Sequence, residues 1–260
     1  MKKQPRIIVW DIETSFMIVK SFGLWNQNHS HKNIVNDWYI ICICWKVLGK
    51  SKVHTLSLDF KNSITSDYEL VKAMRDVLVG CDILIHHNGN AFDLKKFNSR
   101  LIYHGFDPIP PIVCIDTLKE VRKIAKFSSN RLDYLGTHLG LGSKLETGGH
   151  GLWDGVMDGD PKALKLMVKY CIQDIILLEK IYYKLRGYMK VHPNVTSNKK
   201  SKYGLHGIQC PKCGSWKNNK TRVMRAASGK VHQQYKCQGE NCHSYFQLLK
   251  ADPKKIITKI

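Results

Sequence analysis

The sequence contains no run of about 18 apolar residues, the length that a membrane-spanning helix requires. The basic start of the chain also fails to predict a secretory signal, because the apolar stretch at residues 7–9 is too short and Asp11 interrupts it. We therefore expect no contact with a membrane. Nine cysteines in such a chain argue against a disulfide framework and favour a reducing cytoplasm.

Acidic residues are scarce: 21 Asp and Glu stand against 41 Lys and Arg, which gives a formal net charge of +20. The imbalance is uneven, since residues 196–260 hold 14 basic and 2 acidic residues while residues 1–195 hold 27 and 19. A basic surface attracts polyanions, of which nucleic acid is the usual one. The pattern predicts an acidic active site in the body of the chain, assisted by a basic binding module at its end.

Hydrophobic spacing predicts an α/β layered domain with a mixed sheet, in which early strands are followed by strands that alternate with helices. The predicted strands are residues 6–10, 38–48, 54–58, 82–86 and 112–115, and the predicted helices are 68–79, 94–103, 132–139 and 161–185. We expect residues 1–195 to form this domain, residues 196–204 to form a basic linker, and residues 205–260 to form a separate cysteine-containing module.

Three segments carry carboxylates where a strand or helix would direct them inward. Asp11 and Glu13 end an apolar strand, and their spacing of two places both on one face. Asp93 closes residues 88–93 after the fourth strand. Tyr170 and Asp174 share one face of the long helix, because they are four residues apart.

Phosphodiester hydrolysis accounts for these residue types. The reaction builds negative charge on the attacking and leaving oxygens, and two divalent cations about 4 Å apart stabilise both. Mg²⁺ and Mn²⁺ prefer oxygen ligands, so carboxylates hold them well. The sequence therefore predicts a catalytic site for two Mg²⁺ or Mn²⁺ ions at Asp11, Glu13, Asp93 and Asp174.

In these three motifs residues 6–190 resemble the DEDD exonucleases of the ribonuclease-H-like fold, in the subgroup with tyrosine in the third motif. The chain is most similar to small exonuclease-like proteins of bacteriophages and to proofreading domains of family-B DNA polymerases, without a polymerase domain. The resemblance implies that Asp11, Glu13 and Asp174 hold one metal, that Asp11 and Asp93 serve the second, and that Tyr170 orients the attacking water. It also implies contacts of the terminal nucleotide with Thr14, Asn88 and Phe92.

The expected activity is 3′–5′ exonucleolytic hydrolysis of DNA, on single-stranded 3′ ends, with release of nucleoside 5′-monophosphates. The setting implied by the resemblance is the cytoplasm of a bacterium or of a phage-infected cell. Two alternatives remain open at this point. One is an RNA exonuclease or structure-specific nuclease, because nothing in these motifs reads the 2′-hydroxyl. The other is a non-catalytic nucleic-acid-binding adaptor.

Cysteine spacing predicts a zinc ribbon in the C-terminal module. Cys210 and Cys213 are separated by two residues, and Cys237 and Cys242 supply a second pair. Four thiolates form a closed, tetrahedral structural zinc site, and a small module with few apolar residues needs such a staple. The longer second gap leaves His243 as an alternative to Cys242, with His232 as a more remote candidate.

Overall fold

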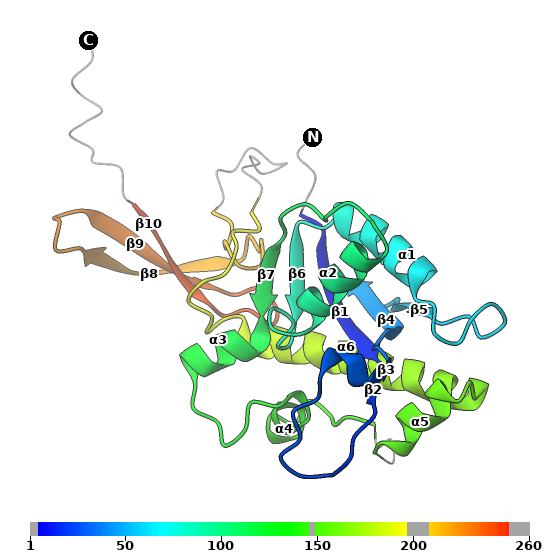
Figure 1. Ribbon diagram of the computed structural model, residues 1–260. Helices are drawn as coiled ribbons and strands as arrows, with labels where there is room; N and C mark the ends of the chain where they lie inside the picture. Colours follow the sequence, from blue (N-terminus) through cyan, green and yellow to red (C-terminus); the bar gives the residue numbers. More distant parts are fainter. Residues whose placement is uncertain (1–4, 146–148, 197–207, 250–260) are drawn as a thin grey trace. The chain divides into compact units, whose positions relative to one another are not determined.

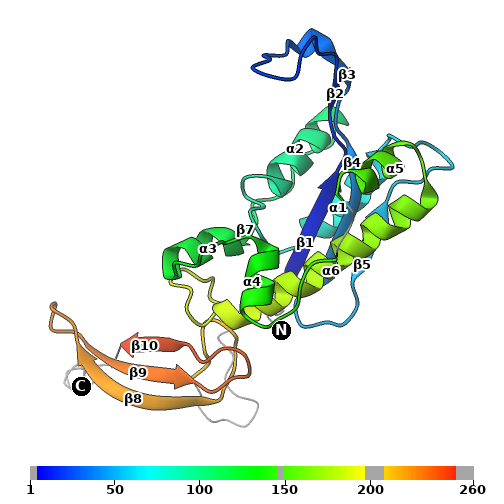
Figure 2. The same ribbon diagram turned by 90° about the horizontal axis from the view of Figure 1, so that it is seen from below.

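The computed structural model describes residues 5–145, 149–196 and 208–249 (Figures 1 and 2). The chain divides into two compact units, one formed by Arg6–Ile181 and the other by Tyr182–Ile260 together with Met1–Pro5. The predicted boundary at residues 195 and 196 stays a prediction. Within the described residues, no helix is long and apolar enough to cross a membrane.

A five-stranded mixed sheet forms the centre of the first unit, in the order β5-β4-β1-β6-β7. The central strand β1 is antiparallel to β4 and parallel to β6, and β6 is parallel to β7. The strands are β1 (Ile7–Thr14), β4 (Ile40–Val47), β5 (His54–Ser57), β6 (Ile83–His86) and β7 (Val113–Asp116). This sheet and its flanking helices confirm the predicted fold class.

Alternation along β1 separates an apolar face from an acidic one. Trp10 packs edge-on against Phe97 of α2 (Asp93–Tyr103), at 5.6 Å between ring centroids. The intervening residue Asp11 faces α6 (Pro161–Leu185), where the Cys171 thiol lies 3.7 Å from the Asp11 carbonyl oxygen. Helix α1 (Tyr68–Val79) contacts α2, β4 and β5. The core on either side of β1 therefore fixes which way its carboxylates point.

Several smaller elements escape the hydrophobic pattern. They are β2 (Ile18–Val19), the 3-10 helix His31–Asn33, β3 (Ile34–Asn36), α3 (Thr117–Ile124) and α5 (Gly151–Met157). Helix α4 (Leu132–His138) was expected. Among the described strands, β2 and β3 pair only with each other, in a two-stranded sheet, and Figure 2 shows this hairpin projecting from the first unit.

The described part of the second unit contains a three-stranded antiparallel sheet in the order β10-β9-β8. Its strands are β8 (Asn218–Arg225), β9 (Val231–Cys237) and β10 (Tyr245–Leu249). A hairpin around Gly229 joins β8 to β9, and β10 adds a third strand to it. A small core of Tyr235, Phe246 and three buried cysteines holds the sheet together.

Candidate active site

Strand β1 and helix α6 bring three of the predicted carboxylates together. One carboxylate oxygen from each of Asp11, Glu13 and Asp174 lies within 4.8 Å of the other two. Asp11 and Glu13 are half-buried, and Asp174 is buried. Glu13 and Asp11 share one face because they are two residues apart on a strand, as expected. Tyr170 lies one turn before Asp174 on α6.

Asp93 lies next to this group without joining it. It is the first residue of α2 and is buried, and its Oδ1 accepts a hydrogen bond of 3.2 Å from the Ile12 amide. The segment before it is held by Asp116, whose carboxylate accepts bonds from the amides of Asn88 and Asn90. A β-carbon at Gly89 would come within 2.4 Å of the His86 ring, so this turn requires glycine.

Lys144 completes the cluster. Its Nζ donates to Asp174 Oδ2 at 2.5 Å and to the Tyr170 hydroxyl at 2.9 Å. Nothing in the sequence pattern singles out this residue, which lies in a loop between α4 and α5 and follows no helical or strand period. Asp174 Oδ1 is buried and has no hydrogen-bond partner among the residues that the structure describes, so this oxygen can accept a ligand.

Comparisons with known proteins show the family of this chain. A family model described as RNase_H superfamily matches residues 36–186, which is more than half of the chain. The protein belongs to the ribonuclease H superfamily. The matched region contains Asp93, Tyr170, Asp174 and Lys144, and it begins after Asp11 and Glu13.

The superfamily fold also appears in a solved structure, the family B DNA polymerase from the archaeon Pyrobaculum calidifontis, at a TM-score of 0.53 and 13% sequence identity. The match covers 70% of this chain and 25% of the polymerase, so the chain spans about a quarter of that protein's length. No curated protein sequence matches. The predicted resemblance to ribonuclease-H-like proteins and to family-B polymerases is confirmed at the level of family and fold.

Burial and mutual repulsion perturb the carboxylates of this superfamily member. Burial, followed by the charges of Asp93, Glu13 and Asp174, raises the pKa of Asp11 well above its ordinary value. Burial and the charge of Asp174 raise the pKa of Glu13 to about 8. Burial raises the pKa of Asp93 to about 6, although bonds from backbone amides oppose the shift. The protein thus holds its acids together at an electrostatic cost.

The donor set fits divalent cations. Three carboxylates converge within bridging distance, and one buried oxygen of Asp174 lacks a partner among the described residues. Because burial and neighbouring acids raise the pKa values of Asp11 and Glu13, a bound cation would favour their deprotonated forms. Lys144 supplies one positive charge; burial alone would lower its pKa, but the ion pair with Asp174 raises it. Hard cations such as Mg²⁺ and Mn²⁺ prefer oxygen ligands, so they suit an all-oxygen site.

The stability of the metal-free protein should fall with rising pH. A carboxyl group whose pKa is raised by folding binds more protons in the folded state than in the unfolded state, so deprotonation weakens folding. For Glu13 this window extends from the ordinary value of 4.5 up to about 8. A divalent cation requires deprotonated ligands, so its affinity should rise across the same window.

Melting temperatures in EDTA and in excess Mg²⁺ would measure both effects between about pH 6 and pH 8.5. We expect the value in EDTA to fall with pH and the gap between the two series to widen. A gap that is independent of pH would argue against a metal site at these carboxylates.

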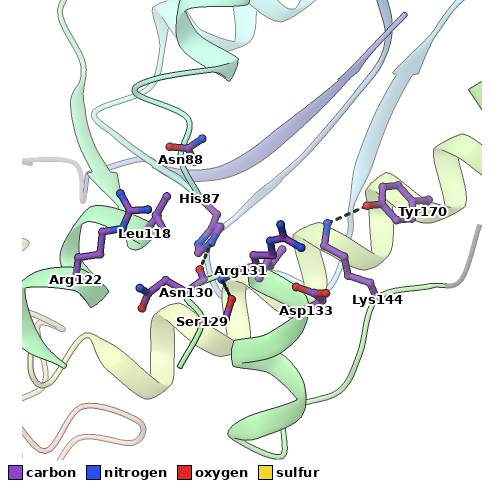
Figure 3. A pocket seen from close by; sticks show the side chains of 11 residues that line it. His87, Asn88, Leu118, Arg122, Ser129, Asn130, Arg131, Asp133, Lys144 and Tyr170 are labelled. Atoms are coloured by element: carbon purple, nitrogen blue, oxygen red, sulfur yellow. Dashed lines mark hydrogen bonds between the residues drawn. The ribbon is translucent and has the colours of Figure 1, made fainter. Parts of the chain in front are cut away.

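An open pocket of about 600 Å³ adjoins the cluster (Figure 3). Tyr170 and Lys144 form one side of it, and Asn88 and Arg122 lie on the other side. The pocket is lined by His87, Asn88, Leu118, Arg122, Ser129, Asn130, Arg131, Leu132, Asp133, Lys144 and Tyr170. Three basic side chains against one acidic side chain favour an anionic occupant.

The three predicted substrate-binding residues have different surroundings. Asn88 lines the pocket, with a left-handed backbone (φ 68°). Thr14 ends β1, and its carbonyl accepts a bond of 3.1 Å from Trp153 Nε1. Phe92 is 42% exposed, which excludes it from the core and leaves its ring available for contact. Their contacts with a nucleotide stay a prediction.

The two histidines that precede the second motif serve the scaffold. His86 is fully buried between Trp10 Nε1 and Asn90 Oδ1, and burial lowers its pKa to about 4, so it stays neutral. His87 bonds to Thr117 Oγ1 and to the Asn130 carbonyl. Both rings have their nitrogens engaged, which leaves metal binding to the carboxylates.

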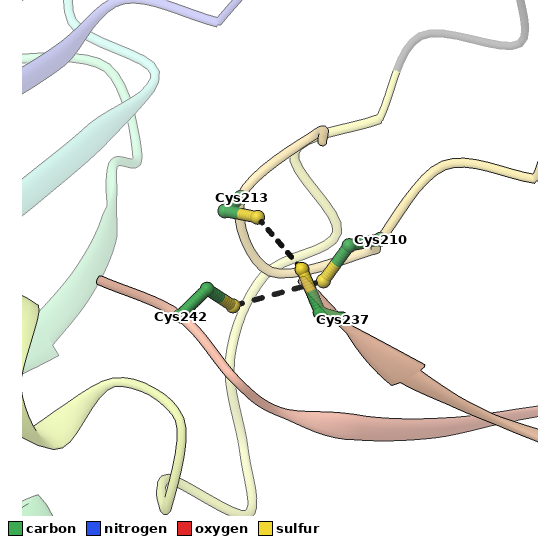
Figure 4. Close-up of side chains that lie close together, drawn as sticks. All are labelled: Cys210, Cys213, Cys237 and Cys242. Carbon is green, nitrogen blue, oxygen red and sulfur yellow. Dashed lines mark hydrogen bonds between the residues drawn. The ribbon is translucent and has the colours of Figure 1, made fainter. Parts of the chain in front are cut away.

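The four predicted zinc ligands converge in the second unit (Figure 4). Sγ atoms of Cys210 and Cys242 are 3.8 Å apart, and those of Cys213 and Cys237 are 3.6 Å apart. A tetrahedron with Zn–S distances of about 2.3 Å has edges of roughly 3.8 Å. The thiols therefore fit Zn²⁺, and Cys242, not His243, belongs to the group.

Proposed function

We propose that this protein is a metal-dependent 3′–5′ exonuclease that hydrolyses single-stranded DNA ends by a two-metal mechanism. Membership of the ribonuclease H superfamily indicates a nuclease-type enzyme. The observation that carries the finer proposal is the convergence of Asp11, Glu13 and Asp174 beside the Tyr170 hydroxyl, at the wall of an open basic pocket. That arrangement supports hydrolysis of a phosphodiester that enters from the pocket.

Asp11, Glu13 and Asp174 would hold one cation, and Asp11 together with Asp93 would serve a second. When bound, such cations stabilise the charge that develops on the attacking and leaving oxygens. Asp93 is anchored by the Ile12 amide, so its position is coupled to the strand that carries Asp11 and Glu13. This bond would keep the two metal subsites in a fixed relation.

Tyr170 and Lys144 would prepare the attack on the scissile phosphate. The Tyr170 hydroxyl accepts a bond from Lys144 Nζ, which leaves its own proton free to orient a water molecule. Burial raises the pKa of Tyr170, so the phenol keeps that proton at neutral pH. We assign Tyr170 the task of positioning water, and Lys144 the task of positioning Tyr170 and Asp174.

Arg122, Arg131 and Asn88 would contact the strand that leads to the scissile bond. The two guanidinium groups lie along the same pocket as Tyr170 and are exposed at its rim. Arginine binds phosphate oxygens in a bidentate fashion and independently of base sequence. The pocket is thus suited to the backbone of a strand whose end lies at the carboxylates.

The test is a hydrolysis assay with 5′-labelled oligonucleotides of identical sequence, offered as single-stranded DNA, duplex DNA and RNA. With Mg²⁺ or Mn²⁺ we expect a ladder that shortens one nucleotide at a time from the 3′ end of single-stranded DNA, with nucleoside 5′-monophosphate as product. EDTA should abolish it. Internal cuts without a ladder would indicate an endonuclease. Faster hydrolysis of RNA than of DNA would indicate an RNA exonuclease. If none of the three substrates is hydrolysed, the protein is better explained as a non-catalytic nucleic-acid-binding adaptor.

A further inference from the structure

The loop between β2 and β3 exposes three large apolar side chains. Phe22 is fully exposed, Leu24 is 91% exposed and Trp25 is 84% exposed. Burial of such side chains against a partner would be favourable, because it removes apolar surface from water. We call residues 20–30 the aromatic loop. The exposed apolar side chains of this loop do not belong to the core of the first unit. Exposed apolar patches of this kind mark interaction sites, so we expect a binding partner for the loop.

The aromatic loop is shaped by its own hydrogen bonds. Ser21 Oγ donates to the Gly23 carbonyl at 2.6 Å, and Gln27 Nε2 donates to the Trp25 carbonyl at 2.9 Å. Asn26 adopts a left-handed conformation, with φ 52°. The amide of Lys20 bonds to the Asn33 carbonyl and closes the base of the hairpin. Such local bonds order the backbone that carries Trp25, whose side chain is 84% exposed.

The base of this hairpin is connected to the carboxylate cluster. It follows directly on β1, which ends one residue after Glu13. Phe16 stacks on Trp153 with ring centroids 6.1 Å apart, and Trp153 meets Tyr170 edge-on at 6.2 Å. A row of aromatic side chains therefore leads from the proposed water-positioning residue to the hairpin. A strand bound at the carboxylates would therefore have aromatic side chains beside it at the base of the hairpin.

The charge around the loop favours a polyanion. Residues 14–36 contain no acidic residue, and they contain Lys20 and Lys32 as well as two exposed histidines, His29 and His31. A protein-binding apolar patch needs no such bias, whereas a nucleic-acid surface combines cations for the backbone with aromatic rings for the bases. Stacking on exposed rings also tolerates any base, which suits an enzyme that degrades a strand.

We propose that the aromatic loop is a base-stacking arm for single-stranded nucleic acid, with Trp25 and Phe22 as the stacking residues and Lys20 and Lys32 as backbone contacts. This inference rests on the proposed nuclease function, because the strand it contacts is the one whose end lies at the carboxylates. It adds a binding surface outside the pocket of Figure 3.

The test compares Phe22→Ala/Trp25→Ala with wild type in EDTA, where no hydrolysis occurs. Binding of a fluorescently labelled oligothymidylate is followed by anisotropy over a salt series. Loss of two stacked bases should weaken affinity at least about tenfold, with an unchanged salt slope because no phosphate contact is lost. Lys20→Ala/Lys32→Ala should instead make the slope shallower. Ile102→Ala, a 79% exposed residue of α2, is the matched control and should bind like wild type.

Hydrolysis of the p-nitrophenyl ester of thymidine 5′-monophosphate separates the two proposals, because a mononucleotide has no further bases that the loop could stack on. The double variant should hydrolyse it at the wild-type rate. If wild type binds the oligonucleotide and the double variant binds it within about twofold, the arm is excluded and the loop belongs to a protein partner. Absence of ester hydrolysis by wild type contradicts the proposed function and leaves the binding result to decide on the arm.

Discussion

Asp11→Asn will lower the hydrolysis rate by about a thousandfold or more while it raises the melting temperature of the metal-free protein. Loss of an outer partner of a metal ligand costs roughly 10- to 100-fold, and a direct ligand should cost more. Asparagine has the same shape but no charge. It therefore removes a buried acid whose pKa is raised by burial and by the charges of Asp93, Glu13 and Asp174.

The gain in stability distinguishes loss of a ligand from misfolding. For a unit of this size, each kcal/mol of repulsion removed raises the melting temperature by about 2–4 °C. We expect that gain in EDTA, together with loss of the stabilisation that Mg²⁺ gives to wild type. Asp76→Asn removes an exposed carboxylate from α1 and serves as the matched control. If the Asp11→Asn variant keeps a tenth or more of the wild-type hydrolysis rate, Asp11 is not a ligand of the catalytic metals.

The parts of the site that follow a regular period could be predicted from the sequence. The spacing of two in β1 predicted that Asp11 and Glu13 converge, and the apolar period of α6 predicted a helix over residues 161–185 that carries Asp174. Helix α1 occupies its predicted residues, 68–79. In each case burial on one face leaves a signal that a single sequence displays.

Other parts depend on contacts that no local pattern encodes. Lys144 reaches Asp174 from an irregular loop, and only the folded chain brings the two together. Asp116 comes directly after the predicted strand 112–115, but its bonds to the amides of Asn88 and Asn90 link positions 28 and 26 residues apart. Strand β2 has only two residues, which is too short for any alternation to appear.

We expect the second unit to fold only when its zinc site is occupied. Loss of zinc should therefore also weaken the binding of nucleic acid by the protein. Two non-cysteine side chains, Tyr235 and Phe246, account for the buried apolar residues around the thiols in the described module. So small a core needs a metal, and structural zinc sites contribute about 10–16 kcal/mol of apparent binding free energy at neutral pH. We expect one Zn²⁺ per chain, which Cys213→Ser should lose and Cys114→Ser should keep.

Loss of zinc should also release the segment that follows α6. Arg186 donates to the carbonyls of Glu240 and Asn241, and Lys212 Nζ donates to those of Gly187 and Met189. A β-carbon at Gly187 would lie 2.3 Å from the Cys242 carbonyl oxygen, so the two segments are in close contact. A truncation at residue 195 would expose this segment, which makes Cys213→Ser and surface substitutions cleaner probes than removal of the module.

Substitution of the exposed basic residues of β8 can test whether the zinc-binding module contacts nucleic acid while the module stays folded. Lys220, Arg222 and Arg225 lie on a strand at the edge of its sheet and are exposed. If each neutralises one phosphate of a single strand, the triple alanine variant should lose about two units of salt slope and bind more weakly. It should keep its zinc and its rate on a mononucleotide ester. Unchanged affinity and slope in both this variant and Cys213→Ser would exclude the module as a nucleic-acid contact and assign it to a protein partner.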